Sequence, residues 1–310
     1  MSNSSENWFG KLFKRGSQPE QKQDAGVAPK PTQDYEILGP VFFWVVRPKA
    51  DPRNAAAWYN KGNSLHRLGH DEEAISSYDK ALALNPRDVD AWTNKAGSLG
   101  SLGRHEEAIL SFDKALALNP RVAMAWSNKG SSLSSLGRFE EALHCYDSAL
   151  KLDSHNDAVW YNKGSSLSSL GRFEEALGCL DKALALNPRD AAAWYNKGSS
   201  LGSLGRHEEA ILSFDKALAL NPRVAMAWSN KGSSLGSLGR FEEALGCLDK
   251  ALELDPHYAL AWFNKALAED KLSKWQEAAL SYEQFLALVP AQYVGPIEYA
   301  HKRLQELEDE

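Results

Sequence analysis

The sequence has few cysteines, no long apolar run and no excess of positive charge. Its 310 residues include three cysteines, and 35 Lys and Arg stand against 41 Asp and Glu, a net charge of −6. Without surplus positive charge to neutralise phosphates, general nucleic-acid binding is disfavoured. The longest apolar stretch, residues 37–46, is interrupted by Gly39 and Pro40. It reaches about half of the ~20 residues that a membrane-spanning helix needs, so we do not expect an integral membrane protein.

Recognisable sites of metal binding and catalysis are missing as well. None of the eight histidines belongs to a His-Glu-x-x-His motif, and no cysteines have zinc-ligand spacing. The recurring Leu-Gly-Arg turns lack the Lys-Ser/Thr of a phosphate-binding loop. Adjacent glutamates recur at six positions, but neighbouring residues on a helix point in different directions, so we interpret them as solvated charges that complement the helix dipole. We expect no metal, no cofactor and no enzymatic activity.

What the sequence does contain is a 34-residue repeat. Seven of the ten tryptophans are spaced by 34 residues: Trp58, Trp92, Trp126, Trp160, Trp194, Trp228 and Trp262. Residues 98–133 are identical to residues 200–235, which lie three units later, so a block of three repeats looks duplicated. Such duplication is tolerated when each unit contacts only its neighbours. Seven near-copies therefore fill residues 55–292.

One unit, residues 191–224, predicts two helices. Trp194 and Gly198 lie on the apolar stripe of the first helix, and Gly205 supplies the left-handed conformation that ends it. Ala210 and Phe214 belong to the stripe of the second helix, which Pro222 terminates. Small residues at 198 and 210 allow the two helices to approach closely. Suitable N-cap residues precede three of the first helices: Asn54, Asp88 and Asp190.

These residues resemble the signature of the tetratricopeptide repeat (TPR), a family of helical-hairpin repeats. The resemblance implies an all-α, right-handed α-solenoid of seven hairpins at about 55–88, 89–122, 123–156, 157–190, 191–224, 225–258 and 259–292, with a capping helix in 293–310 that begins at Pro296. Departures occur at three places: Ser154 replaces the expected proline, Phe285 a small alanine and Glu269 a stripe leucine. We therefore expect the seventh unit to be a less regular, terminal repeat.

Residues 1–50 differ in composition and are expected to be largely disordered, with a candidate short amphipathic helix near the start. Its apolar residues are interleaved with Lys11, Lys14 and Arg15 and are Trp8, Phe9, Leu12 and Phe13. They lack the apolar core and cleavage site of a secretory signal. An unstructured end, membrane docking and partner docking all remain open. Residues 41–46, Val-Phe-Phe-Trp-Val-Val, have strand composition and form either an irregular cap on the first repeat or a partner-docking strand.

The resemblance also places candidate binding residues on the concave face. One position carries an asparagine in every unit: Asn60, Asn94, Asn128, Asn162, Asn196, Asn230 and Asn264. This row is either structural or a ladder that resembles the peptide-holding asparagines in the TPR region of O-GlcNAc transferase. The position before it adds the flat side chains Tyr59, Tyr161, Tyr195 and Phe263. It holds no lysine, which disfavours a carboxylate clamp of the Hsp70/Hsp90 type. The lysine that follows each asparagine is expected to cover apolar surface with its stem.

We therefore expect a scaffold or adaptor that binds an extended segment of a partner protein in the concave groove. The alternative is a membrane-peripheral assembly factor positioned by its N-terminal basic-aromatic segment. Cys145, Cys179 and Cys247 share one repeat position, and successive helices are too far apart for disulfides. Reduced, packed thiols favour the cytoplasm, with the inner face of a membrane as a peripheral location under the alternative.

Overall fold

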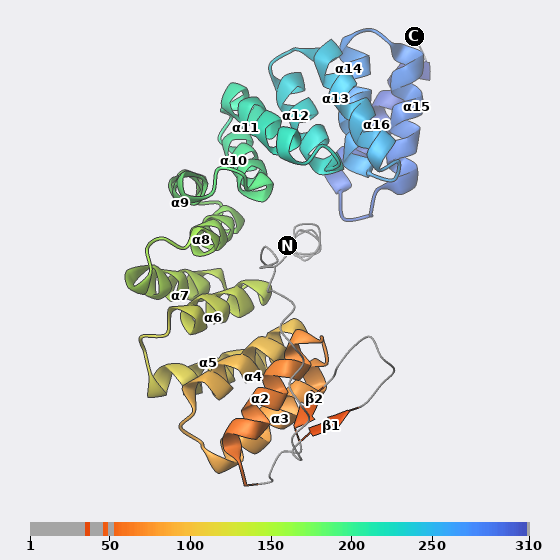
Figure 1. Cartoon of the computed structure of the whole chain (residues 1–310). Helices are drawn as coiled ribbons and strands as arrows, with labels where there is room; N and C mark the ends of the chain where they lie inside the picture. The colour runs from red at the N-terminus through yellow and green to blue at the C-terminus, as the bar shows by residue number, and fades with distance from the viewer. Residues whose placement is uncertain (1–34, 38–45, 49–52, 309–310) are drawn as a thin grey trace. The chain divides into compact units, whose positions relative to one another are not determined.

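The structure, a computed structural model, describes residues 35–37, 46–48 and 53–308. These residues form 15 helices and one small two-stranded sheet (Figure 1). Strand β1 (Tyr35–Ile37) pairs antiparallel with β2 (Val46–Pro48), with Ile37 opposite Val46. Of the run with strand composition, only Val46 is described, and it lies in β2. The expected amphipathic helix and the rest of the run fall outside the described residues.

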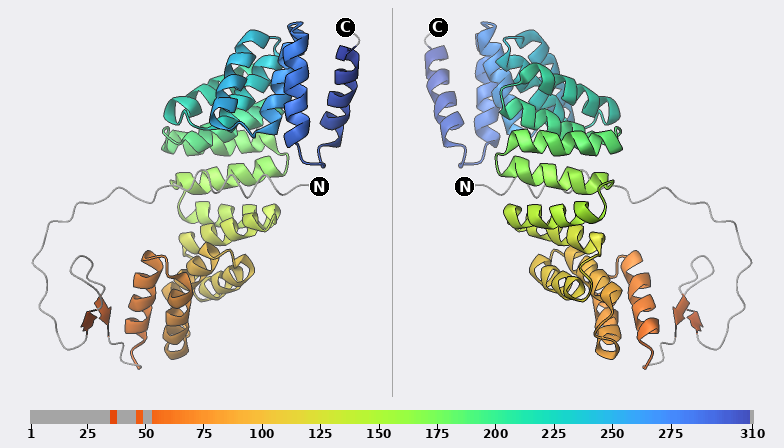
Figure 2. Two further views of the ribbon diagram at one scale, coloured as in Figure 1. Left: turned by 90° about the vertical axis from the view of Figure 1, so that its right-hand side faces the viewer. Right: turned by 90° about the vertical axis from the view of Figure 1, so that its left-hand side faces the viewer.

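The chain divides into two compact units, Met1–His155 and Asn156–Glu310, and each is described by itself. The first unit contains three hairpins. Their helices are α2 (Ala55–Arg67) and α3 (Asp71–Leu84), α4 (Val89–Ser101) and α5 (His105–Leu118), and α6 (Ala123–Ser135) and α7 (Phe139–Leu152). Within this unit each helix packs against the next one in the chain, as Figure 2 shows for the stacked hairpins.

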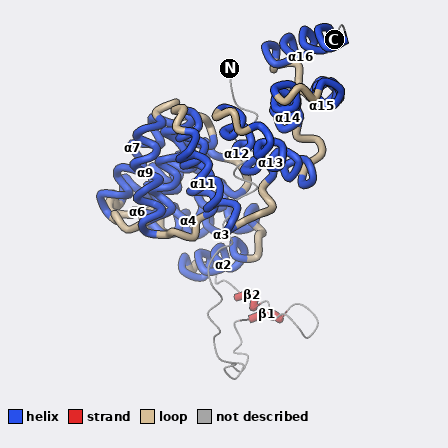
Figure 3. Tube along the Cα trace, turned by 90° about the horizontal axis from the view of Figure 1, so that it is seen from above, coloured by secondary structure: helices blue, strands red, loops and turns tan. Residues whose placement is uncertain are grey.

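The second unit contains four hairpins and a final helix. Its helices are α8 (Asp157–Ser169) and α9 (Phe173–Leu186), α10 (Ala191–Ser203) and α11 (His207–Leu220), α12 (Ala225–Ser237) and α13 (Phe241–Leu254), α14 (Ala259–Lys271) and α15 (Trp275–Leu288), and α16 (Val294–Glu308). Short loops join them (Figure 3). The capping helix starts two residues before the predicted Pro296, because proline is tolerated in the first turn.

The helix ends follow from the predicted capping residues. The side chains of Asn54, Asp88 and Asp190 accept hydrogen bonds from backbone amides in the first turns of α2, α4 and α10. Six hairpin turns contain a glycine in the left-handed region, with φ between 74° and 78°. In each of these turns the following residue donates its amide hydrogen to a carbonyl in the helix, as Arg206 does to Leu201 at 2.9 Å.

The two helices of a hairpin pack closely because of a glycine in the first helix. A Cβ atom at Gly198 would lie 2.7 Å from the Phe214 ring, and one at Gly232 would lie 2.8 Å from Leu248. Gly62, Gly130 and Gly164 are equally crowded. Ala210, which faces this contact from the second helix, is fully buried. The expected close approach is confirmed at these positions.

The seventh hairpin departs from the others where the sequence does. Phe285 is fully buried and lies in a cluster with Ala266, Tyr282 and Ala300, so it fills space between α14, α15 and α16. Arg303 of α16 donates two hydrogen bonds of 2.8 Å to Asp270 of α14. These contacts attach the capping helix to the last repeat.

Ser273 stands where six other turns have glycine, and its φ of 58° is in the left-handed region. A Cβ atom is unfavourable there, so we predict that Ser273→Gly raises the free energy of unfolding of the second unit by about 0.5–1 kcal/mol. The matched reverse change, Gly239→Ser, should lower it by a similar amount. Urea unfolding followed by circular dichroism measures both free energies. If neither variant differed from the wild type, the backbone at Ser273 would not be strained.

Glu269 is 5% exposed and accepts a hydrogen bond of 2.6 Å from Ser281. Burial raises the pKa of this carboxyl, although Ser281 and Lys265 act against the rise. The folded state therefore holds the proton more tightly than the unfolded state. Its contribution to stability is full below the ordinary pKa of glutamate and is lost as pH rises through the folded-state pKa.

We predict that Glu269→Leu, which restores the residue of the other repeats, raises the melting temperature more at pH 7 than at pH 4. Ser281 keeps a partner in this variant, because the matching Ser213 donates to the carbonyl four residues earlier. Leu235→Glu is the matched control and should make the melting temperature fall as pH rises from 4 to 7. A Glu269→Leu gain that is equal at both pH values would show that the carboxyl is not the cause.

Candidate functional site

The first helices of consecutive hairpins form one face of each unit. They contact one another directly: α2 with α4 and α4 with α6 in the first unit, and α8, α10, α12 and α14 in succession in the second. In the described part of each unit, no two consecutive second helices make comparable contact. Each unit is thus narrower on the side of its first helices. We call the surface made by these helices the inner face.

The asparagine row lies on the first helices with unequal exposure. Asn60 and Asn128 are exposed, and the other five are half-buried: Asn94, Asn162, Asn196, Asn230 and Asn264. Asn94 donates hydrogen bonds from Nδ2 to the hydroxyl of Tyr59 at 3.1 Å and to Oδ1 of Asn63 at 2.9 Å. Asn63 also accepts a hydrogen bond of 2.8 Å from Tyr78. In the first unit this asparagine therefore joins two neighbouring repeats.

The same arrangement recurs in the second unit. Asn230 donates a hydrogen bond of 2.8 Å to the hydroxyl of Tyr195, which belongs to the preceding repeat. Tyr195 is only 4% exposed, and burial raises its pKa far above the ordinary value. The sequence reasoning did not foresee this pairing of rows. A signal for it exists: in both cases a tyrosine stands 35 residues before the asparagine.

The other predicted flat side chains also take part in packing. Tyr59 and Tyr161 are half-buried, and Tyr59 lies 6.2 Å from Tyr78 between ring centroids. Phe263 packs 4.9 Å from Phe285 and 6.0 Å from Tyr299 of the capping helix. These contacts leave part of each ring of Tyr59 and Tyr161 at the surface, whereas Tyr195 is almost covered.

Small hydroxyl side chains occupy much of the remaining inner face. Several donate to the carbonyl four residues earlier on the same helix, as Ser135 does to Ser131 at 3.0 Å and Ser237 does to Ser233 at 3.1 Å. Ser168 and Ser200 are hydrogen-bonded across two repeats at 2.9 Å. The central first helices α6, α8, α10 and α12 carry only their repeated lysine and Asp157 as charged residues.

The repeated lysine lies beside the tryptophan of its own repeat, and in five units it also pairs with the preceding repeat. Its ammonium group lies 5.1–5.8 Å from the centre of the tryptophan ring three residues earlier in all seven units. Five of the lysines form ion pairs of 2.5–2.6 Å with an aspartate of the preceding second helix: Lys95, Lys129, Lys197, Lys231 and Lys265. The expectation that the lysine head lies in water or near an acidic side chain is confirmed in its second form for these five.

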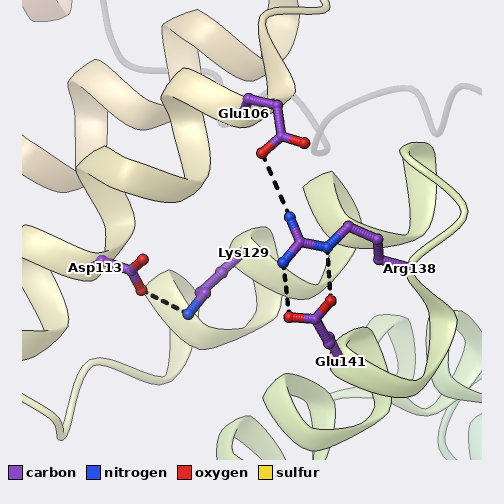
Figure 4. A network of polar contacts seen from close by, with 5 residues as sticks. All are labelled: Glu106, Asp113, Lys129, Arg138 and Glu141. Atoms are coloured by element: carbon purple, nitrogen blue, oxygen red, sulfur yellow. Dashed lines mark hydrogen bonds and ion pairs between the residues drawn. The ribbon is translucent and has the colours of Figure 1, made fainter.

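Arginine and tryptophan make further contacts between repeats. Figure 4 shows Lys129 reaching Asp113, and Arg138 placed between Glu141 and Glu106 of the preceding repeat. Such arginines hold the pKa of their exposed glutamate partners, Glu141 among them, below the ordinary value. The glutamate pairs are therefore exposed, as expected, but ion-paired as well. Trp126 donates from its indole nitrogen to the carbonyl of Pro120 at 2.9 Å, and four other tryptophans do the same.

Cys145, Cys179 and Cys247 are buried and form no disulfide, and burial raises the pKa of Cys145 to about 11. Among residues 35–37, 46–48 and 53–308 no group of three His, Cys, Asp or Glu side chains has a metal-binding arrangement. Over the same residues, no helix combines the length and the apolarity required to cross a membrane. Trp8, Phe9, Leu12 and Phe13 lie outside the described residues.

Sequence profiles decide the family. Two profiles described as tetratricopeptide repeat match the chain, one at residues 55–88, 123–156 and 225–258 and the other at residues 72–123 and 161–225. The chain belongs to the tetratricopeptide repeat family. TPR arrays of this kind are scaffolds for protein interaction, which sets the general function of the chain. No curated protein sequence matches it.

Solved structures agree with this assignment. YrrB, described as a TPR protein with an unusual peptide-binding site, is 30% identical over 59% of this chain and 95% of its own, with a TM-score of 0.54. PilF of Pseudomonas aeruginosa is 22% identical over 73% of this chain and 99% of its own, with a TM-score of 0.59. A MamA protein is 23% identical over 61% and 95%, with a TM-score of 0.51. The last two likenesses show the fold alone.

The bond between Asn230 and Tyr195 gives a stability prediction. Asn230→Ala should lower the free energy of unfolding of the second unit by about 0.5–1.5 kcal/mol, because a half-buried hydrogen bond between repeats is lost. Tyr195→Phe should cost a similar amount, and the double variant should cost less than the sum of the two single variants. Denaturant titration of the four proteins measures the coupling. Strict additivity would show that the bond contributes nothing.

Proposed function

We propose that the inner face binds an extended segment of a partner protein through backbone-directed hydrogen bonds, and that the chain is a non-catalytic adaptor of the cytoplasm. The supporting observation is the exposure of Asn60 and Asn128 among small, neutral side chains on the first helices. An asparagine amide offers both donors and an acceptor, which matches the donor and acceptor of a peptide unit. The three cysteines are buried and form no disulfide, which fits a reducing compartment.

Three features of the inner face favour an extended peptide over other ligands. Gly97 and Gly100 on α4 and Gly202 on α10 leave room for a backbone to approach closely. The low charge of the central first helices gives no preference for an acidic or a basic client. YrrB, the 30% identical neighbour, is described as having a peptide-binding site. We therefore expect binding that tolerates differences in client sequence.

The asparagines of the row differ in exposure and in their hydrogen bonds, and we assign them to three groups for this proposal. The amides of Asn94 and Asn230 already donate to a tyrosine of the preceding repeat, so they position the face. Asn60 and Asn128 are the exposed members and are the residues that we expect to bind the client backbone first. The remaining half-buried members, Asn162, Asn196 and Asn264, complete the proposed binding row together with Tyr59, Tyr161, Tyr195 and Phe263.

We predict that Asn60→Ala with Asn128→Ala weakens capture of an unfolded, uncharged polypeptide about tenfold, since two net hydrogen bonds contribute about 0.5–1.5 kcal/mol each. The melting temperature should not change, because these side chains are exposed. Fluorescence anisotropy with a labelled permanently unfolded polypeptide measures the affinity. The matched control is Lys216→Ala with Lys250→Ala on the second helices, which should bind normally. Unchanged affinity of the asparagine variant at equal helicity would overturn the proposal.

A second candidate role is peripheral membrane attachment through residues 1–15. The observation that favours it is the basic-aromatic sequence, since each basic group near an anionic surface contributes about 1 kcal/mol. If this role holds, Trp8→Ala with Phe13→Ala should abolish co-sedimentation of the full chain with anionic liposomes, and wild-type binding should weaken with salt. Retained sedimentation of the variant, or none by the wild type, would remove this candidate.

A further inference from the structure

The outer side of the second helices carries exposed leucines at one repeat position. Among the described residues, the three most exposed large apolar side chains are Leu110 and Leu212, each 65% exposed, and Leu280, 62% exposed. They are separated by multiples of 34 residues and lie on the second helices α5, α11 and α15. Single exposed leucines are common on soluble proteins, so only their arrangement can indicate binding.

In the second unit these leucines alternate with glycines. The second helices α9, α11, α13 and α15 hold, in this order, Gly178, Leu212, Gly246 and Leu280 at this position. A Cβ atom at Gly178 or Gly246 would meet nothing within 4 Å, so both glycines leave the surface open. Projecting side chains and openings therefore alternate along the outer face, by which we mean the surface made by these four helices.

The opening at Gly246 is a hollow of about 410 Å³ where α11, α12 and α13 meet. Its apolar wall consists of Ile211, Trp228, Leu235 and Cys247. The charged residues that line it form two ion pairs of 2.6 Å, Lys231 with Asp215 and Arg240 with Glu243, so their charges balance. Because a charged group would lose its hydration there without gaining a partner, the hollow favours an aliphatic side chain.

The first unit has an exposed leucine but no glycine beside it. At the same repeat position its second helices hold Ser76, Leu110 and His144. His144 stands where the matching repeat of the second unit has Gly246, and its ring lies 6.2 Å from the ring of Trp126 between centroids. The alternation of leucine and glycine is therefore a property of the second unit.

The order Gly, Leu, Gly, Leu is complementary to its own reverse. A two-fold axis that lies between α11 and α13 and runs parallel to them makes the order in one copy run opposite to that in the other. Since equivalent repeat positions lie at the same height along their helices, Leu212 then faces Gly246 of the second copy, and Leu280 faces Gly178. An axis centred on either helix would instead place leucine against leucine.

The area of the outer face suits a dimer of moderate stability. Each of its four helices has 14 residues, and such a helix is about 21 Å long and about 10 Å wide with its side chains. Together they present about 800 Å², which is what a standard interface buries on each partner. The face is convex, because the unit is narrower on the side of its first helices, so the central pair makes the closest contact. We therefore expect a dissociation constant of micromolar order.

Charge does not oppose this contact strongly. Five of the seven carboxylates on α11 and α13 are ion-paired within their own unit: Glu209, Asp215, Glu243, Asp249 and Glu253. A carboxylate that is paired with a cation repels a like face less than an isolated one does.

We propose that the outer face of the second unit is an interface between two copies of this chain, in which Leu212 of each copy fills the hollow at Gly246 of the other. The inner faces of the two second units then point away from each other and stay open to clients. This dimer goes beyond the proposed function and does not compete with it.

Complementary substitutions test the interface in the full chain. Leu212→Gly leaves openings that face openings, and Gly246→Leu leaves leucines that face leucines. Other repeats already have each of these residues at this position, so circular dichroism should show unchanged helicity. Sedimentation velocity over a range of concentrations should give each variant a dissociation constant at least about tenfold above that of the wild type. An equimolar mixture of the two variants should dimerise as the wild type does, because both contacts between unlike chains then pair a leucine with an opening.

Leu110→Gly is the matched control and should dimerise like the wild type. Residues 98–133 and 200–235 are identical, and Leu110 is as exposed as Leu212. A wild type that stays monomeric up to about 100 μM would overturn the proposal. Equal weakening by Leu110→Gly and Leu212→Gly, or folded variants that do not associate when mixed, would also overturn it. Assemblies that grow beyond two copies would indicate a head-to-tail contact in place of the two-fold interface.

Discussion

The close approach of two helices at a small residue, glycine in five hairpins and alanine in two, is the contact on which each hairpin depends. Where Gly198 faces Phe214, there is no room for a side chain larger than hydrogen without movement of the ring. Ala96 and Ala266 occupy this position in two other repeats and are fully buried, so these two hairpins accommodate a methyl group there. Because the apolar face of one hairpin is too small to be covered by itself, this local contact becomes stable only when hairpins stack.

Stacking in turn determines which side chains are left for function. The repeated tryptophan, lysine and arginine bind the linker, the aspartate and the glutamate of a neighbouring repeat, as Trp228, Lys231 and Arg206 do in the second unit. Part of the positive charge is thereby used at the junctions between repeats. The inner face keeps amides, hydroxyls and glycines, and its amides are the groups that pair with a peptide backbone in the function proposed above.

The periodic part of the fold was predictable because its physical causes repeat. The 34-residue spacing, the N-cap at Asp190 and the left-handed Gly205 each specify a local conformation without reference to distant residues. The first residue of α16 was harder to predict from the sequence, because Pro296 is compatible with any position in the first turn of a helix. The bond from Asn230 to Tyr195 was missed because it depends on the register between two repeats rather than on a pattern within one.

A duplicated repeat changes its surface without a change in its core. Positions 144 and 246 lie on the outer side of a second helix, where His144 contacts Trp126 and Gly246 meets nothing within 4 Å. Neither residue alters the buried alanines and leucines that hold the helices together, such as Ala142 and Ala244. One substitution therefore converts a filled wall into a hollow at little expense to stability beyond the lower helix propensity of glycine, about 1 kcal/mol relative to alanine. In a protein with nearest-neighbour packing, such outward positions differ between copies without disturbing the buried contacts that the copies share.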